Sequence, residues 1–305
     1  MMTVKRDIIS VTDMMEDLED IVDLSIKLKK ERYSSYDVAR NRVLGMIFEK
    51  PSTRTRVSLE TGMTQLGGHA IYLNPNDMQV GRGETVADTA RVLSRMVDVI
   101  SYRAFKHASV VELAKNASVP VINALDDLEH PVQIVADLMT IKEKKGRLAG
   151  LKLAYTGDGN NMANSLMLGC AITGIDVSIG CPERYKPNTE IFNTAKEIAK
   201  STGSRVEVVH DPKKAVESAD VVYTDVWVSM GEESQKAEKE KIFGPYQVND
   251  ELVSHASKDY LFMHCLPAHR GLEVSDSVMG SLHSVVFDEA ENRLHTAKGI
   301  LLTLL

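Results

Sequence analysis

Short apolar runs alternate with longer amphipathic stretches in the first half of the chain. Residues 11–31 have an acidic, amphipathic pattern that predicts a helix, and the apolar run at 42–49 predicts a buried strand. The same patterns predict further strands at 69–73, 97–102 and 119–124, and helices at 53–66 and 84–96. Such alternation is typical of a parallel α/β sheet, in which helices connect successive strands.

The second half repeats this alternation after a long amphipathic helix. That helix begins at His130-Pro131, because proline suits the first helical position, and Gly146 ends it. The strands then expected are at 151–157, 176–180, 205–210, 221–226, 260–266 and 285–288. The charged stretch 231–241 predicts a loop, and residues 293–305 predict a last helix whose apolar end must be buried.

We therefore expect an α/β protein with two doubly wound parallel-sheet domains joined by interdomain helices. The first domain is expected at residues 1–133, with the C-terminal helix 291–305 packing back against it. The second domain is expected at residues 134–290. In folds of this class ligands bind beyond the carboxyl ends of the strands, so polar motifs at those ends are the candidates for function.

Composition and charge narrow the classes of partner. The 305 residues are 43% hydrophobic and 26% charged, with a net charge of −7, which fits a soluble globular protein and does not favour nucleic-acid binding. The three cysteines are widely spaced, which argues against a disulfide framework and suits a reducing compartment. The N-terminus has no apolar signal segment, and no stretch approaches the roughly 20 apolar residues of a membrane span. We expect a cytoplasmic protein without nucleic-acid or membrane partners.

A cluster of hydroxyl and guanidinium groups follows the strand at 42–49. It consists of Ser52, Thr53, Arg54 and Thr55. The first turn of a helix has unpaired backbone N–H groups that favour an anion, and a guanidinium group matches phosphate oxygens. An ordinary helix cap with solvated arginines is the alternative that this cluster alone leaves open. The sequence has no GxxxxGK[ST] loop, so a nucleoside triphosphate is not expected.

Further donors follow two other predicted strands of the first half. Arg103 comes after the strand at 97–102, and His130 and Gln133 come after the strand at 119–124. Because parallel strands end at the same edge of a sheet, these side chains could face an oxygen held near Ser52. A histidine directly before a proline also has the simpler explanation of a helix cap.

Several long motifs together resemble the aspartate/ornithine carbamoyltransferase family. In the first half these are FEKPSTRTR at 48–56, DTARVL at 88–93 and HPVQ at 130–133. In the second half, the motifs similar to ornithine-specific members are GDGNN at 157–161, DVWVSMG at 225–231 and HCLPAHRG at 264–271. The resemblance runs from residue 7 to residue 298, and several motifs in one order are far more specific than any single motif.

The resemblance implies that the first domain binds carbamoyl phosphate and the second L-ornithine. The residues it places at carbamoyl phosphate are Ser52, Thr53, Arg54, Thr55, Gln79, Arg103, His130, Gln133, Cys265, Leu266 and Arg293. Those it places at L-ornithine are Asn161, Asp225, Ser229 and Met230. The residues it implies in catalysis are Arg103, His130, Cys265 and Arg293. Gln79 matches a residue that the family supplies to the neighbouring subunit, which implies a homotrimer or an assembly of trimers.

The implied reaction is direct attack of the ornithine δ-amine on the carbamoyl carbon, through a tetrahedral intermediate. Arg103, His130 and the backbone N–H of Thr55 could stabilise the charge that develops on the carbonyl oxygen. Cys265 would position or deprotonate the amine, unless it is a buried structural cysteine. The segment from Ser229 resembles a lid, which implies that carbamoyl phosphate binds before ornithine.

Other activities remain as alternatives to this one. Aspartate, putrescine or N-acetylornithine could be the acceptor within the same family, although Asp225 offers a carboxylate for an α-amino group. A dinucleotide-binding dehydrogenase is disfavoured, because Met162 stands where the third glycine of its motif would be. A non-catalytic amino-acid-binding regulator is disfavoured by the intact set of Arg54, Arg103 and His130.

Neither a cofactor nor a metal is expected. His264 and His269 are the residues that suggest a metal, but their spacing without a third nearby ligand is a weak signal. The motifs fit a biosynthetic as well as a catabolic enzyme.

Overall fold

The computed structural model describes residues 5–31, 36–79, 83–228 and 233–305. The chain divides into two compact units, Met1–Met139 with Glu291–Leu305 and Thr140–Ala290. It passes from one unit to the other inside two helices, α5 (Pro131–Lys145) and α12 (Val286–Leu304). Each unit has its own parallel sheet and its own apolar core.

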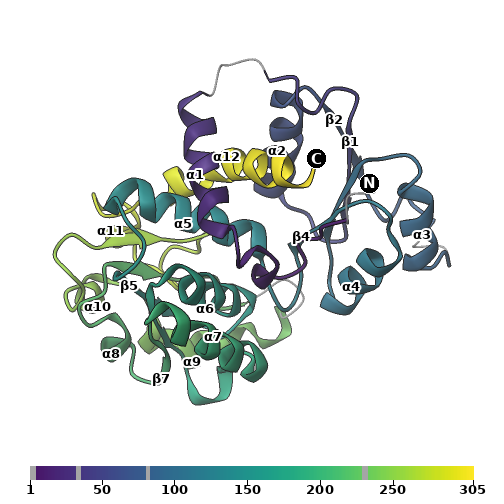
Figure 1. Ribbon diagram of the computed structural model, residues 1–305. Coiled ribbons are helices and arrows are strands. Elements are labelled where there is room, and N and C mark those ends of the chain that lie inside the picture. Colours follow the sequence, from purple (N-terminus) through teal and green to yellow (C-terminus); the bar gives the residue numbers. More distant parts are fainter. Residues whose placement is uncertain (1–4, 32–35, 80–82, 229–232) are drawn as a thin grey trace. The chain divides into compact units, whose positions relative to one another are not determined.

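The first unit is built on a parallel sheet with the strand order β2-β1-β3-β4. Its strands are β1 (Val43–Phe48), β2 (His69–Leu73), β3 (Val99–Arg103) and β4 (Val121–Leu125). Its other elements are η1 (Val11–Met14), α1 (Leu18–Lys30), α2 (Thr53–Gln65), α3 (Val86–Leu93) and α4 (His107–Asn116). The chain crosses the sheet in opposite directions after β1 and after β2, so right-handed connections place α2 on one face and α3 and α4 on the other (Figure 1).

The second unit is built on a parallel sheet with the strand order β7-β6-β5-β8-β9. Its strands are β5 (Lys152–Thr156), β6 (Asp176–Gly180), β7 (Val206–Val209), β8 (Val221–Tyr223) and β9 (Leu261–Met263). Its helices are α6 (Asn161–Thr173), η3 (Glu183–Tyr185), α7 (Thr189–Thr202), α8 (Pro212–Val216), η4 (Glu233–Gln235), α9 (Lys236–Phe243), η5 (Gly244–Tyr246), α10 (Asp250–Val253) and α11 (Asp276–Met279). By the same handedness, α6 and α7 cover one face of the sheet and α8 and α10 the other (Figure 1).

The expected class, two parallel α/β domains, is confirmed. The strands predicted at 69–73 and 176–180 coincide with β2 and β6, and most other predicted elements differ from the observed ones by a few residues at their ends. The helix α4 was not among the predicted elements. Its sequence lies between two apolar strands, and its buried side chains Val110 and Leu113 join the core that covers this face of the first sheet.

The prediction of a strand at 285–288 is wrong. An isolated bridge joins Ser284 to Phe262 of β9, and the chain then turns into α12, well before the start predicted for the last helix. Asp288 and Glu289 lie in the first turn of α12, where acidic side chains interact favourably with the helix dipole. The apolar run was therefore the beginning of a buried helix.

The prediction of a loop at 231–241 is wrong for the described part of that stretch. The short helix η4 and the helix α9 occupy it, in keeping with the helix propensity of its Lys, Glu and Ala residues. Lys239 is buried and donates a hydrogen bond to Asp158 Oδ2 at 2.6 Å, and Phe243 stacks on Trp227. A buried ion pair and an aromatic contact thus anchor a segment whose composition indicates exposure to solvent.

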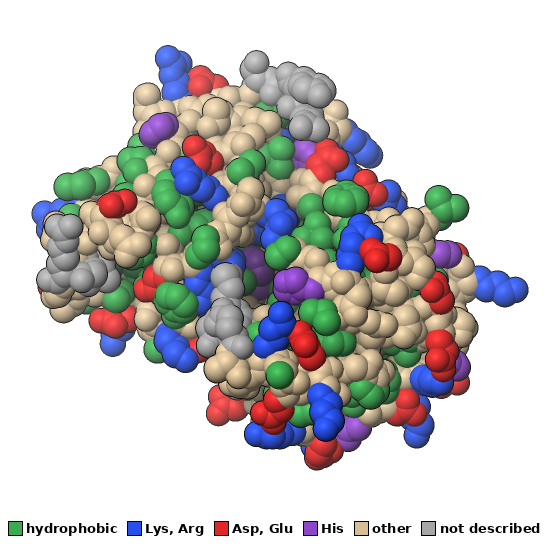
Figure 2. Space-filling view, turned by 180° about the vertical axis from the view of Figure 1, so that it is seen from behind, with side chains coloured by type: hydrophobic (Ala, Val, Ile, Leu, Met, Phe, Trp, Pro, Cys, Tyr) green, Lys and Arg blue, Asp and Glu red, His purple; other side chains and the backbone are tan. Residues whose placement is uncertain are grey.

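Charged side chains of both signs lie interspersed on the face that Figure 2 shows, in keeping with the modest net charge of −7. Apolar side chains are scattered among them, as on most folded proteins. Among the described residues, no helix is long and apolar enough to cross a membrane.

Candidate active site

The strand register of the first unit brings its sequence motifs to one edge of the sheet. Phe48 of β1 pairs with Arg103 of β3, and Arg103 pairs with Leu125 of β4. The segments that carry Ser52 and His130 therefore leave the sheet beside Arg103. Because β2 and β3 flank β1, the strand order reverses at this edge, which is where open α/β sheets bind their ligands.

Ser52 caps α2, the helix expected to bind the anion. Its hydroxyl oxygen accepts a hydrogen bond from the N–H of Thr55 at 3.3 Å. The Thr55 N–H that we expected to stabilise the carbonyl oxygen is therefore directed at Ser52, although this hydrogen bond is long. Ser52 and Thr53 also border a surface hollow that continues along α2 to Tyr72. The start of α2 is thus open to the surface.

Arg293 of α12 connects α2 with α5 within the first unit. Its guanidinium group donates a hydrogen bond to the Thr55 hydroxyl at 3.1 Å and another to Gln133 Oε1. Gln133 in turn donates to Asp137 Oδ1 at 2.8 Å. Arg293, Thr55 and Gln133 are all buried. Three of the predicted carbamoyl-phosphate residues, far apart in the sequence, therefore lie in direct contact.

His130 is buried among positive charges. Burial lowers the pKa of its imidazole well below the ordinary value, and the charges of Arg293, Arg103 and Arg54 lower it further. The ring is therefore neutral at pH 7, and a neutral imidazole has one N–H to donate to an oxygen. Three guanidinium groups around a neutral imidazole make this edge of the sheet electropositive, as the binding of an anion requires.

Lys50 belongs to the same group of positive charges and was not among the predicted site residues. It is buried, and its ammonium nitrogen lies 4.9 Å from the centre of the Phe105 ring. Burial lowers the pKa of Lys50, and the charge of Arg103 lowers it further. The available signal was its position at the end of β1, directly before Pro51 and Ser52.

In the second unit the carboxyl ends of β5, β8 and β9 lie side by side. Tyr155 of β5 pairs with Tyr223 of β8, and Tyr223 pairs with Met263 of β9. Because β6 lies on the other side of β5, the strand order reverses between β5 and β8. The three motifs of the second half follow these three strands, so they meet at this edge.

Asp225 is the centre of a polar cluster at this edge of the second sheet. Its buried carboxylate accepts hydrogen bonds from the Cys265 thiol at 3.1 Å and from the Asn160 amide at 2.9 Å. Asn160 also caps α6 by accepting hydrogen bonds from two N–H groups of its first turn. The predicted Asn161 is the first residue of α6. Asn160 was not predicted, although its place just before the helix in GDGNN was an available signal.

The segment after β9 carries Cys265 and Leu266. The N–H of Leu266 donates to His264 Nδ1 at 2.8 Å, so His264 carries its proton on Nε2, which lies 3.3 Å from Glu273 Oε1. Asp225, His264 and Cys265 have ligand atoms within 4.8 Å of one another, a spacing that could suit a metal ion. Because both ring nitrogens of His264 already have partners, this geometry does not favour a metal ligand.

The other predicted site residues lie apart from these two clusters or outside the described residues. Gln79 is exposed in the segment after β2, and its backbone carbonyl accepts a hydrogen bond from the N–H of Glu84 at 3.1 Å. Ser229 and Met230, with the start of the expected lid, lie outside the described residues.

Polar groups thus collect where the strand order reverses in each sheet, cations and hydroxyls in the first unit and a carboxylate, an amide and a thiol in the second. These features define a two-unit parallel α/β protein with an electropositive site in its first unit and a site centred on a carboxylate in its second. Residues 6–143 match the family model for the carbamoyl-P binding domain of aspartate/ornithine carbamoyltransferase, and residues 149–304 match that for its Asp/Orn binding domain. The chain belongs to the aspartate/ornithine carbamoyltransferase family.

Similar proteins cover the full length of the chain. The ornithine carbamoyltransferase of Picrophilus torridus is 66% identical over 301 residues, which are 99% of either chain. The catabolic ornithine carbamoyltransferase of Thermoplasma volcanium is 64% identical over 301 residues, again 99% of either chain. Among solved structures, the ornithine carbamoyltransferase from Pyrococcus furiosus is 51% identical, with a TM-score of 0.94 over 99% of this chain and 98% of that chain.

Proposed function

We propose that the protein is an enzyme that transfers the carbamoyl group of carbamoyl phosphate to the δ-amine of L-ornithine, giving L-citrulline and phosphate. The observation that carries this proposal is the identity of 64–66% over 301 residues with relatives named ornithine carbamoyltransferase. The amine attacks the carbamoyl carbon directly and forms a tetrahedral intermediate, so the reaction needs no covalent enzyme intermediate.

The site in the first domain, residues 1–133 and 291–305, binds carbamoyl phosphate in this proposal. The residues that hold the phosphate are Ser52, Thr53, Arg54 and Thr55 at the start of α2. Those that surround the carbamoyl group are Arg103, His130, Gln133 and Arg293. The neutral imidazole and the guanidinium groups stabilise the charge that develops on the carbonyl oxygen, and one such donor contributes about 3 kcal/mol. The contacts of Arg293 with Thr55 and Gln133 support this grouping.

The site in the second domain, residues 134–290, binds L-ornithine. Asp225 pairs with the α-amino group of the substrate, and Asn161, Ser229 and Met230 contact the same end of the amino acid. The buried carboxylate at the point where the strand order reverses supports this assignment.

Cys265 and Leu266 lie near the carbamoyl nitrogen and the attacking amine in the proposed complex. The thiol of Cys265 donates a hydrogen bond to the Asp225 carboxylate and keeps its proton, so it is not arranged to accept a proton from the substrate. We therefore assign Cys265 a role in orienting the amine and not in deprotonating it.

A panel of acceptors tests the proposed activity. With carbamoyl phosphate as donor, kcat/KM for L-ornithine should exceed the values for aspartate, putrescine and N-acetylornithine by at least about 100-fold, because ornithine alone of the four offers both a free α-amino group to pair with the buried carboxylate and a δ-amine to attack. The measurement is citrulline formation for ornithine and phosphate release for the other acceptors. If any of the other three acceptors had a higher kcat/KM than ornithine, that acceptor would be the preferred substrate and the proposal would be wrong.

We also propose that the enzyme works as a homotrimer or an assembly of trimers, in which Gln79 reaches the phosphate site of the neighbouring subunit. Gln79 is exposed, and the hollow that begins at Ser52 and Thr53 is open to the surface. Both observations support a site completed by a second copy of the chain.

Mixed oligomers test this arrangement. Gln79→Ala and Arg54→Gln subunits should each have low activity alone. Co-expression of the two should restore part of the activity, because some sites then combine an intact Arg54 from one subunit with an intact Gln79 from its neighbour. Light scattering gives the oligomeric state in parallel, and mixed samples no more active than the two single variants would refute the shared site.

A further inference from the structure

Asp126 holds together the turn between β4 and α5, and His130 lies at the end of this turn, directly before the helix. It is fully buried. Its Oδ1 accepts hydrogen bonds from the N–H groups of Leu128 and Glu129, each at 2.8 Å, and its own N–H donates to the carbonyl oxygen of Glu129 at 3.0 Å. Three hydrogen bonds thus close the chain segment that ends directly before His130.

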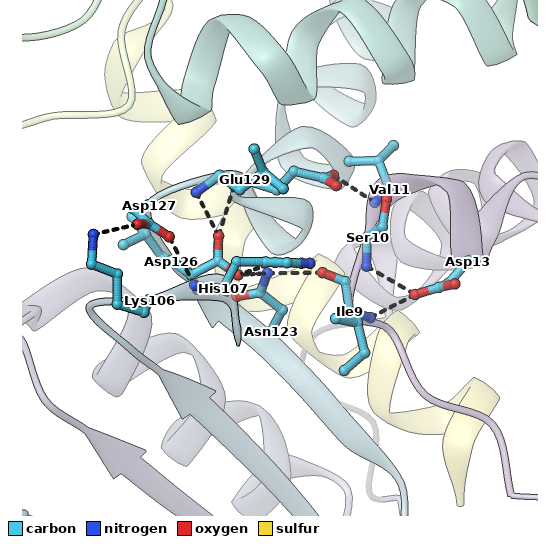
Figure 3. A network of polar contacts seen from close by, with 12 residues as sticks. Ile9, Ser10, Val11, Asp13, Lys106, His107, Asn123, Asp126, Asp127 and Glu129 are labelled. Atoms are coloured by element: carbon cyan, nitrogen blue, oxygen red, sulfur yellow. Dashed lines mark hydrogen bonds and ion pairs between the residues drawn. The ribbon is translucent and has the colours of Figure 1, made fainter. Parts of the chain in front are cut away.

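The second oxygen of the same carboxylate faces the rest of the first unit. Asp126 Oδ2 lies 2.6 Å from His107 Nδ1 and accepts a hydrogen bond from Asn123 Nδ2 at 2.8 Å (Figure 3). Asn123 also donates to the carbonyl oxygen of Ile9, and its Oδ1 accepts from the N–H of Leu125. Leu125 has a φ of 147°, a conformation that non-glycine residues rarely adopt, so these contacts maintain a strained turn.

His107 is the first residue of α4 and completes the pair. Its side chain is 28% exposed, and its hydrogen bond to Asp126 raises the pKa of the imidazole. The backbone N–H of His107 donates to Asp127 Oδ1 at 2.8 Å, and Lys106 forms a solvated ion pair with Asp127 Oδ2 at 3.0 Å. Helix α4 is thus joined to the turn through both aspartates.

We propose that Asp126 is a positioning residue: paired with His107, its carboxylate fixes the turn that places His130 and Gln133 at the carbamoyl group. This inference rests on the proposed carbamoyl transfer. It adds two residues that do not touch the substrate but set the alignment of residues that do. The phosphate site at the start of α2 shares none of these hydrogen bonds, so misalignment of the turn should act on the chemical step more than on phosphate binding.

Other charged groups face the pair and set its response to pH. Asp127 and Glu129 lie on the turn itself, and the negative charges of Asp127 and, once it is ionised, of Glu129 help keep His107 protonated. Lys50, from the segment between β1 and α2, faces Asp126 and Asp127. As the pH rises through the raised pKa of His107, the imidazolium loses its charge and the pair weakens.

The test compares kcat and the KM for carbamoyl phosphate in Asp126→Asn, His107→Asn and the double variant. Asparagine at 107 keeps an N–H donor near the position of Nδ1 but cannot become charged. We expect kcat to fall about 10- to 100-fold in each single variant, as for a small misplacement of reacting groups, while the KM for carbamoyl phosphate changes less than about threefold. The kcat of the double variant should be no lower than that of the less active single variant, because both substitutions break the same Asp126–His107 pair.

The pH dependence separates positioning from a merely structural role. The ratio of wild-type kcat to His107→Asn kcat should be largest at a pH below the raised pKa of His107 and shrink as the pH rises through that pKa, because above it neither enzyme carries a charge at position 107. Deprotonation of the ornithine amine cancels in this ratio. Lys106→Ala, which removes the solvated ion pair on the same turn, is the matched control and should keep kcat within about twofold.

A His107→Asn enzyme with wild-type kcat at every pH would overturn the proposal, as would additive losses in the double variant or a KM increase as large as the fall in kcat. If Asp126→Asn does not fold, the kinetics of His107→Asn still test the proposal, because position 107 is partly exposed and tolerates substitution more easily. A wild-type protein that forms no citrulline would instead refute the proposed function, so the two failures are distinguishable.

Discussion

The contact between Cys265 and Asp225 determines how the thiol can act in the reaction. The thiol donates a hydrogen bond to a buried carboxylate at 3.1 Å, and the same carboxylate is held by Asn160. A serine at position 265 can make the same donation, whereas an alanine cannot. The two substitutions therefore separate the loss of a hydrogen bond from the loss of a thiol.

We expect Cys265→Ala to lower kcat about 10- to 100-fold through misplacement of the amine, and Cys265→Ser to stay within about fivefold of the wild type. Neither substitution should move the ascending limb of the kcat profile with pH, because the thiol does not take the amine proton. Steady-state kinetics from pH 6 to pH 10 give both quantities. A serine variant as impaired as the alanine variant, with a displaced limb, would indicate that Cys265 is the base.

Glu129 is a buried carboxyl group whose ionisation opposes folding near neutral pH. Burial raises its pKa to about 7 from 4.5, and the N–H of Val11 donates to its Oε2 at 2.9 Å. The folded state therefore binds the proton more tightly than the unfolded chain. The stability that this tighter proton binding contributes is fully present below the pKa of Glu129 in the unfolded chain. It is lost as the pH rises through the pKa of Glu129 in the folded state.

Glu129→Gln removes this titration and keeps an oxygen acceptor for Val11. At pH 8 the variant should be more stable than the wild type by about 1–3 kcal/mol, and at pH 5 the two should be nearly equal. Melting temperatures at the two pH values measure the difference. A variant that is less stable at pH 8, or equally changed at both pH values, would show that hydrogen bonds offset the cost of burying the ionised carboxylate of Glu129.

At the scale of elements, α12 lies so close to α1 in the first unit that position 299 has no room for a side chain. A Cβ atom on Gly299 would lie 2.3 Å from Ser25 Oγ and 3.3 Å from the carbonyl oxygen of Ile21. We expect Gly299→Ala to lower the free energy of unfolding by about 1–3 kcal/mol, because overpacking forces the helices apart. Thermal unfolding followed by circular dichroism measures the change.

Two comparisons make this prediction specific. Ser25→Ala in the Gly299→Ala background should recover part of the loss, since it removes the nearest clashing atom. Gly62→Ala on α2 is the matched control, because its Cβ would meet Ala297 Cβ at 3.4 Å, an ordinary contact, and should be nearly neutral. Equal losses at positions 62 and 299 would mean that helix glycines matter here for a reason other than close approach.

The elements that could be predicted from the sequence are those whose apolar pattern decides their structure. The buried strands β2 and β6 and the start of α5 at Pro131 are of this kind. Helix α9 was misread because its charged composition indicates a loop, whereas the pairing of Lys239 with Asp158 depends on a residue 81 positions away. The start of α12 was misread because an apolar run beside β9 fits a strand and a buried helix equally well.

The same reasoning explains what could be predicted of the candidate site. Motifs at strand ends indicated Arg54 and Arg103, because the carboxyl edge of a parallel sheet is where ligands bind, whereas Asp225 was predicted from the family resemblance. The network around Asp126 depends on the strand register and on the contact between β4 and α4, which the sequence pattern does not reveal.

At the scale of the whole molecule, each unit is proposed to bind one substrate. In this proposal carbamoyl phosphate binds at the electropositive edge of the first sheet, and L-ornithine binds at the carboxylate at the edge of the second. A substitution of a residue that binds only one of the substrates should therefore change the KM for that substrate and leave the other KM nearly unchanged.

Measurement of both KM values in Arg54→Gln and Asp225→Asn is the most direct test of this claim. Arg54→Gln should raise the KM for carbamoyl phosphate at least about 10-fold, as expected for loss of a charged hydrogen bond, and leave that for ornithine within about threefold. Asp225→Asn should do the reverse. If either substitution raised both KM values equally, or if the two effects were exchanged, the division of substrates between the units would be contradicted.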